Sequence, residues 1–208
     1  MIRTTFKVML AAAAFGGLAS VATASSTANW RLTHFAGETS AFYTLTTLPF
    51  IERLTQLTRG EVSITPYPGG VLAPPLEGYN AVRDGIADVG HLTPMYIVNV
   101  HPVNSFWGGH PGGMGPEAFI QWLYEAGGAD LLAEFRRETS NLHGLILSAG
   151  PAEVWHSHTP IRTPEDLAGL RFRSGSAWAT ILAEYFDAAP TSVPGSEVYT
   201  MLERRAID

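Results

Sequence analysis

The sequence predicts an α/β protein with a largely parallel sheet, and three observations support this. Short strand-like runs alternate with helix-like runs from residue 30 onward, an order typical of parallel sheets. Gly60 and Gly85 stand where two of the helices should end, since glycine favours the position after a helix. The pattern then begins again after Pro160, so we expect a second α/β unit.

The first unit is predicted to hold most of the strands and helices. We expect strands at 30–35, 61–65 and 87–92, and helices at 49–59 and 75–84. Residues 94–115 read as a long irregular connection, a kind of segment that is often functional. Two helices at 117–125 and 129–138 and a buried strand at 142–149 follow.

The second unit starts at Thr163-Pro164-Glu165-Asp166, which has the form of a helix start: a hydroxyl cap, a proline and two acids. A strand at 171–173, a helix at 176–186, a short strand at 191–193 and a helix at 197–205 are expected next. Ala206-Ile207-Asp208 resembles the first step into a further strand. We therefore expect the chain to be a fragment with an incomplete second unit.

Residues 1–24 predict a secretory signal peptide. Two basic residues precede an apolar run at 8–18, and Ala22-Thr23-Ala24 is a small-residue cleavage pattern. The run is too short for a membrane span, which disfavours the alternative of an uncleaved anchor. Beyond residue 24, 11 arginines against 19 acidic residues leave a net charge of −8, which argues against nucleic-acid binding. The chain has no cysteine, so disulfides and thiolate chemistry are excluded.

Motifs of catalysis are missing from the sequence. There is no nucleophile elbow, no P-loop and no dinucleotide-binding glycine motif after a strand. His156-Ser157-His158 suggests a metal site, but no further ligands stand at a typical spacing. Two loop histidines near a domain boundary are the simpler interpretation.

Two arginines alternate with a phenylalanine in the stretch GLRFRSGSAW at 169–178. Side chains two apart in a strand share a face, so Arg171 and Arg173 should lie side by side, opposite Phe172. Their negative partner is either a nearby acid, Asp166 or Glu165, or the carboxylate of a ligand, which a guanidinium binds with two parallel hydrogen bonds. The spacing does not choose between the two arginines.

Aromatic residues and one acid are the other candidates for a binding site. The aromatic candidates are Tyr96 and Trp107 in the long connection, and Trp155 and Trp178 near the arginines. Small-molecule pockets are mostly apolar with a few placed polar groups. Glu153 stands between a predicted buried strand and Trp155, where it could hold a cation or bind a substrate amine or hydroxyl.

Four segments taken in order resemble the substrate-binding proteins of TRAP transporters, the DctP-type periplasmic family. They are LTRGEVSITPYPGGVL, AVRDGIADVG, TPIRTPEDLAGLRFR and VPGSEVYTMLERRAID. WLYEAGGADLLAEF, with the last of these segments, is similar to the subgroup that binds 2-oxo acids and related monocarboxylates. The resemblance covers roughly residues 29–208.

The resemblance implies a two-lobed periplasmic binding protein fold with the ligand in the cleft between the lobes. It selects Arg173, the last residue of the G-L-[KR]-x-R motif, as the partner of the ligand carboxylate, and it makes Trp155 a stacking wall. At Glu153 the chain departs from the family, which has arginine or glutamine there; a glutamate could still be a ligand of a bridging sodium or calcium ion. Members run about half as long again, in agreement with a truncated second lobe.

From these observations we expect a signal peptide at 1–24, a first lobe at 25–149 and the start of a second lobe at 150–208. The resemblance implies that the protein captures an organic acid, a monocarboxylate or 2-oxo acid, and delivers it to a membrane permease driven by an ion gradient. The expected site residues are Arg173, Glu153, Trp155, Tyr96, Trp107 and Trp178, in a monomer or dimer. The alternatives are an exported metal-dependent hydrolase using His156, His158 and Glu153, and a periplasmic ligand-sensing domain.

Overall fold

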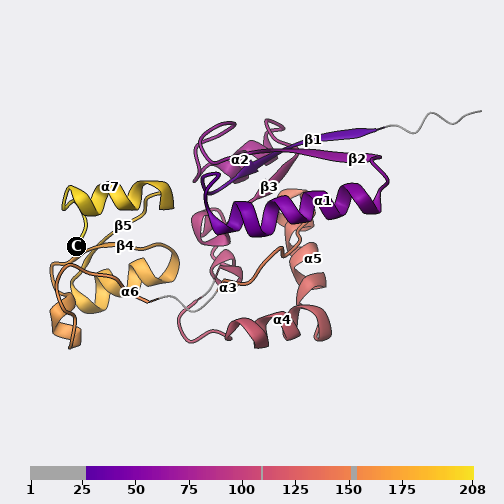
Figure 1. Cartoon of the computed structure of the whole chain (residues 1–208). Coiled ribbons are helices and arrows are strands. Elements are labelled where there is room, and N and C mark those ends of the chain that lie inside the picture. Colours follow the sequence, from indigo (N-terminus) through magenta and orange to yellow (C-terminus); the bar gives the residue numbers. More distant parts are fainter. Residues whose placement is uncertain (1–26, 109, 151–153) are drawn as a thin grey trace, which may run out of the picture.

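A computed structural model describes residues 27–208 of the chain, except 109 and 151–153. The predicted signal peptide at 1–24 and the candidate residue Glu153 therefore lie outside the described residues. The described chain forms two α/β groups that stand beside each other (Figure 1). We refer to residues 28–140 as the first lobe and to residues 164–208 as the second lobe.

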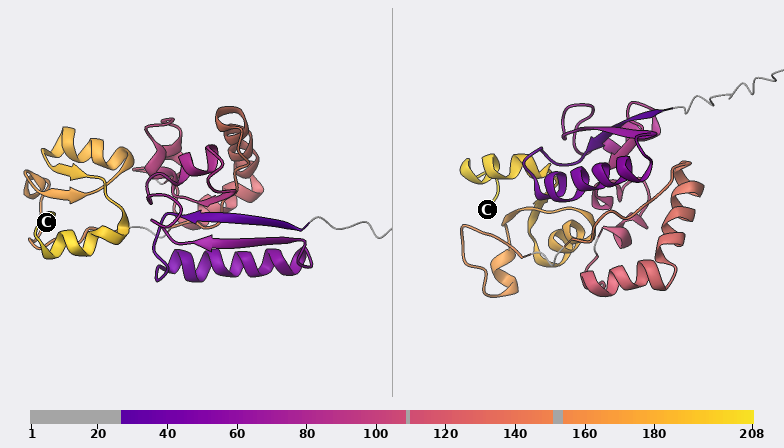
Figure 2. Two further views of the ribbon diagram at one scale, coloured as in Figure 1. Left: turned by 90° about the horizontal axis from the view of Figure 1, so that it is seen from above. Right: turned by 45° about the vertical axis from the view of Figure 1, so that its right-hand side comes forward.

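The first lobe is built on a parallel sheet of strands β1 (Ala28–His34), β2 (Val62–Tyr67) and β3 (Val89–His91), in the order β2-β1-β3. Helix α1 (Leu48–Leu57), preceded by the π-helical turn η1 (Phe42–Thr47), lies on one side of the sheet, and α2 (Gly78–Arg83) lies on the other (Figure 2). The register places His34 of β1 opposite His91 of β3 at the carboxyl end of both strands.

Four further helical segments complete the first lobe: η2 (Pro94–Ile97), α3 (Asn104–Trp107), α4 (Pro116–Glu125) and α5 (Gly128–Ser140). Leu123 and Leu132 pack on Trp107 to form a core beneath α4 and α5, and the Trp107 ring stacks on Trp122 with centroids 5.5 Å apart. The helices therefore share a small core of their own.

The second lobe holds a two-stranded parallel sheet of β4 (Arg171–Arg173) and β5 (Ala189–Thr191), packed with α6 (Ser176–Phe186). Its other elements are the 3₁₀ turns η3 (Pro164–Leu167) and η4 (Gly195–Glu197) and helix α7 (Val198–Glu203). Leu167, Phe172, Leu182 and Ala188 form its buried core. The turn η3 is the helix start expected from the sequence: the Asp166 carboxylate accepts hydrogen bonds from the backbone N–H groups of Arg162 and Thr163.

The expected α/β class with parallel strands is confirmed, and so are most of the expected elements. Gly85, with φ at +75°, ends α2 in the left-handed region that glycine tolerates best, although α2 begins three residues later than expected. The connection at 94–115 is not wholly irregular, since it contains η2 and α3.

The buried strand expected at 142–149 is wrong. These residues form neither strand nor helix, and the Leu145 side chain is 71% exposed. A strand exists only when its backbone pairs with a neighbour, and no described strand lies in register with this apolar stretch.

Candidate functional site

The two arginines of β4 share a face of the strand but have different partners. Phe172 between them is buried in the core of the second lobe, as the alternation predicts. Arg171 Nε and Nη2 donate to the two carboxylate oxygens of Asp208 at 3.0 and 2.6 Å. This ion pair lowers the pKa of Asp208 to about 2, because the hydrogen bonds from Arg171 favour the charged carboxylate. Neither Asp166 nor Glu165, the acids that the sequence suggested, pairs with either arginine.

Arg173 is half-buried and makes no ion pair with any described residue. Its Nε donates to the Val193 carbonyl oxygen at 3.2 Å, and its Nη2 donates to the Tyr96 hydroxyl at 2.8 Å. A guanidinium has five N–H donors, so three of them remain available to an acceptor. The two arginines therefore differ in the structure, although their spacing in the sequence did not distinguish them: Arg171 pairs with an acid and Arg173 bonds only to neutral groups.

Tyr96 belongs to η2, which follows β3 in the first lobe, whereas Arg173 ends β4 in the second. Among the described residues, their hydrogen bond is the only one that joins a side chain of one lobe to the other lobe. Loops that follow the carboxyl ends of parallel strands are the usual place for a ligand site in α/β proteins. The pair therefore marks the point where the loops after the two sheets meet.

A cleft of about 380 Å³ lies beside this hydrogen bond. Its walls come from the start of α2 and from η2 in the first lobe, with Ser192 contributed by the loop after β5 in the second. Tyr96 is one of the lining residues, and Ser192 neighbours Val193, the other partner of Arg173. The volume falls within the range typical of small-molecule sites.

A cluster of aromatic and histidine rings supports Tyr96 from the first lobe. The Phe35 ring lies 6.4 Å from Tyr96 and 5.5 Å from His91, centroid to centroid. His91 meets His34 edge-on at 4.5 Å, and its Nδ1 lies 2.6 Å from the Thr47 hydroxyl. Burial lowers the pKa of His91 to about 4, with a smaller contribution from the neighbouring His34.

His34 and His91 were not among the site residues expected from the sequence. The sequence did contain an indication of the pair. Both histidines stand near the carboxyl ends of predicted strands, and parallel pairing brings such ends together. The pair is neutral at pH 7, since burial lowers both pKa values. It therefore contributes packing and hydrogen bonds rather than charge to the cluster that supports Tyr96.

The three candidate tryptophans have other neighbours in the structure. Trp107 is 7% exposed and forms part of the core of the first lobe. Trp155 lies 5.4 Å from Phe172 and 6.2 Å from Trp178, centroid to centroid, and Phe172 points to the face of β4 opposite Arg173. None of the three lines the cleft beside Tyr96.

Candidate cation ligands do not cluster among the described residues. No three histidine, aspartate or glutamate side chains gather there in a geometry suited to a metal ion. His158, a candidate metal ligand, lies instead with its Nε2 3.3 Å from the Leu202 carbonyl oxygen. Glu153, the candidate cation ligand, lies outside the described residues.

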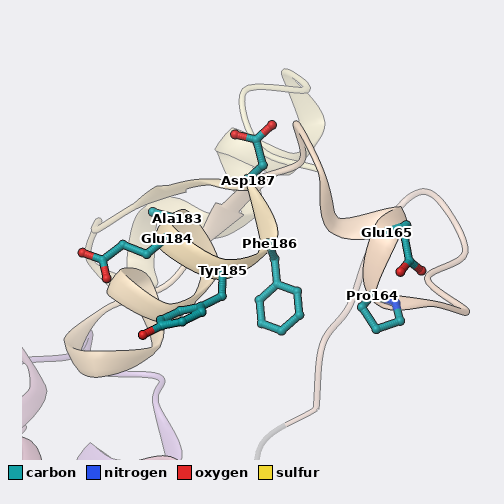
Figure 3. A pocket seen from close by; sticks show the side chains of 7 residues that line it. All are labelled: Pro164, Glu165, Ala183, Glu184, Tyr185, Phe186 and Asp187. Carbon is teal, nitrogen blue, oxygen red and sulfur yellow. The ribbon is translucent and has the colours of Figure 1, made fainter.

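A second hollow of about 410 Å³ lies at the end of α6, next to η3 (Figure 3). It is lined by Pro164, Glu165, Ala183, Glu184, Tyr185, Phe186 and Asp187. Three of these residues are acids and none is basic, so this surface would repel an organic anion. The hollow is a poor site for a carboxylate, and the cleft beside Arg173 is the better candidate.

The chain belongs to the bacterial extracellular solute-binding proteins of family 7, the DctP family, whose model matches residues 32–208. The match confirms the family that the sequence was expected to belong to. It is a family of transporter solute-binding proteins and not of enzymes, so the hydrolase alternative is not supported. In the described part of the chain, no helix is long and apolar enough to cross a membrane.

Individual relatives agree with the family. The monocarboxylate 2-oxoacid-binding periplasmic protein of Nostoc sp. is 29% identical over 161 residues, which is 76% of this chain and 43% of that protein. A TRAP periplasmic solute-binding protein from Pseudoalteromonas atlantica, solved with sodium and pyruvate, is 25% identical with a TM-score of 0.73, over 88% of this chain and 55% of its own.

A solute-binding protein from Bordetella bronchiseptica, solved with calcium and picolinate, is 24% identical with a TM-score of 0.75 over 88% of this chain and 54% of its own. These likenesses confirm the two-lobed fold of the TRAP solute-binding proteins. The chain spans about half the length of the relatives it matches.

Proposed function

We propose that this chain is part of an extracytoplasmic solute-binding protein that holds an organic acid, a monocarboxylate or 2-oxo acid, in the cleft beside Arg173. The protein would pass its ligand to the membrane permease of a TRAP-type transporter. A first lobe at 25–149 and a second lobe from 150 onward, joined near Gly150, would close around the ligand.

The observation that carries the proposal is the contrast between the two arginines of β4. Arg171 is paired with Asp208 on both carboxylate oxygens, so its charge is already compensated. Arg173 is half-buried, has no acid partner among the described residues, and faces the loops where the two lobes meet. A partly desolvated guanidinium with free N–H donors favours a carboxylate that can accept two hydrogen bonds at once.

The relatives support a small organic acid as the ligand. The Nostoc protein is described as binding monocarboxylate 2-oxo acids, and the Pseudoalteromonas protein was solved with pyruvate. The cleft has room for about a dozen water volumes, which is more than a three-carbon acid needs. We therefore extend the proposed class to acids longer than pyruvate.

The proposal also includes export of the protein and a bound cation. We propose that residues 1–24 direct export and are removed, and that the protein then works in the periplasm as a monomer or dimer. A role for Glu153 as a sodium or calcium ligand would appear as ligand affinity that falls on chelation and returns with the ion.

A thermal-shift screen on the complete product of the gene that encodes this chain tests the proposal. Pyruvate, lactate, longer 2-oxo acids, dicarboxylates and aromatic acids would be compared, each with and without calcium or sodium. A ligand at about a hundred times its dissociation constant stabilises a protein by roughly 2.7 kcal/mol, which gives an easily measured shift. We expect one or more monocarboxylates to stabilise the protein.

Two matched variants make the screen specific. Arg173→Gln removes the charge that we assign to the ligand, and Arg171→Gln removes the charge that Asp208 compensates. We expect the shift to disappear in Arg173→Gln and to persist in Arg171→Gln. A monocarboxylate shift of equal size in both variants would overturn the proposal.

A further inference from the structure

One side chain gives the cleft a second charge. Glu77, the residue before α2, is the only carboxylate or cationic side chain among those that line the described cleft. It is exposed, and its carboxylate accepts a hydrogen bond from the Asn80 side-chain amide. The remaining polar lining groups are neutral amides and hydroxyls, such as those of Asn99 and Ser192.

Glu77 makes no ion pair with Arg83, the basic residue of α2, although the two charges attract each other at longer range. Arg83 donates from Nε and Nη2 to the two carboxylate oxygens of its neighbour Asp84, at 2.8 and 3.2 Å. No described ion pair involves Glu77. The carboxylate therefore remains available to a molecule in the cleft.

The two charges come from different lobes. Glu77 lines the cleft from the first lobe, and Tyr96, which also lines it, is hydrogen-bonded to Arg173 of the second lobe. A small acid whose carboxylate is held by Arg173 would occupy only part of the volume of about 380 Å³. The rest of a longer ligand would extend along the wall that carries Glu77.

We propose that Glu77 selects ligands by the group at the end opposite their carboxylate, favouring a hydroxyl or an ammonium and disfavouring a second carboxylate. This inference rests on the proposed function, because it requires the first carboxylate to be held by Arg173. An ionised carboxylate only accepts hydrogen bonds, so it pairs with a donor and repels a like charge. Specificity of this kind depends as much on the repulsion as on the attraction.

The expected effect is modest because Glu77 is exposed to solvent. Charge pairs at such positions change an affinity by up to about fivefold. High salt should reduce the discrimination, since exposed charges are screened.

Four acids with the same number of carbons test the inference by titration calorimetry on the complete gene product. They are butyrate, 4-hydroxybutyrate, 4-aminobutyrate and succinate, which differ only in the group at the far end. We expect the hydroxyl and ammonium compounds to bind about fivefold more tightly than butyrate, and succinate to bind more weakly. Glu77→Gln should bring the four affinities together, and Glu77→Lys should make succinate the preferred acid.

The controls separate this inference from the proposed function. Glu61→Gln removes an exposed acid at the opposite, amino end of β2, and it should leave the order of the four acids unchanged. If Arg173→Gln abolishes binding of all four acids but Glu77→Gln leaves their order unchanged, the role of Glu77 is refuted while the function stands. If Arg173→Gln binds them as well as the native protein does, the proposed function itself fails.

Discussion

The buried histidine pair makes the stability of the first lobe depend on pH. The pKa of His91 is lowered from 6.5 to about 4 by burial, so the folded protein holds His91 neutral at a pH where the unfolded chain binds a proton. The stabilisation is complete above pH 6.5 and is lost as the pH falls towards 4. Because the pKa of His91 is 6.5 in the unfolded chain and about 4 in the folded protein, the free energy of unfolding at pH 5 is about 2 kcal/mol lower than at high pH.

Urea unfolding at pH 7 and pH 5, followed by circular dichroism, measures this loss in the complete gene product. Replacing His91 with glutamine removes the titrating group but keeps a hydrogen-bonding side chain near Thr47. We expect the variant to lose about 2 kcal/mol less than the native protein between the two pH values. His143→Gln, which removes an exposed histidine, is the matched control. An unchanged pH dependence in His91→Gln would refute the argument that burial keeps this ring neutral.

Three further substitutions test other parts of the structure. Tyr96→Phe removes the hydroxyl bonded to Arg173 and should weaken binding of the acid found in the screen by about fivefold in calorimetry; an unchanged affinity would contradict a role for this hydroxyl in holding the guanidinium. Arg171→Gln breaks the ion pair with Asp208 and should lower the midpoint of thermal unfolding while leaving that affinity unchanged; lost binding would mean that both arginines contact the ligand. Leu182→Ala opens the core of the second lobe and should cost about 2–5 kcal/mol in urea unfolding, and a cost below about 1 kcal/mol would contradict the tight packing described for it.

Local patterns in the sequence were sufficient for most of the fold. The alternation of Arg171, Phe172 and Arg173 correctly gave the two faces of β4, because side-chain direction in a strand depends only on neighbouring residues. Gly85 correctly marked the end of α2, since the left-handed backbone it adopts is a local requirement.

The features that could not be predicted depend on partners distant in the chain. The apolar stretch at 142–149 has the composition of a strand, but strand formation needs a neighbouring backbone that no local pattern reports. Arg171 pairs with Asp208, which is 37 residues away in the sequence, and Arg173 bonds to Tyr96, which is 77 residues away. Trp107 looked like a ligand wall because it stands in a long connection, yet that connection folds into a helix that buries it.

The most direct test of the central claim is a crystal structure of the complete gene product with its acid bound. The account predicts a ligand carboxylate within hydrogen-bond distance of the Arg173 guanidinium, with Arg171 still paired to Asp208. A ligand carboxylate bound away from Arg173, with the guanidinium still bonded only to Tyr96 and Val193, would contradict it.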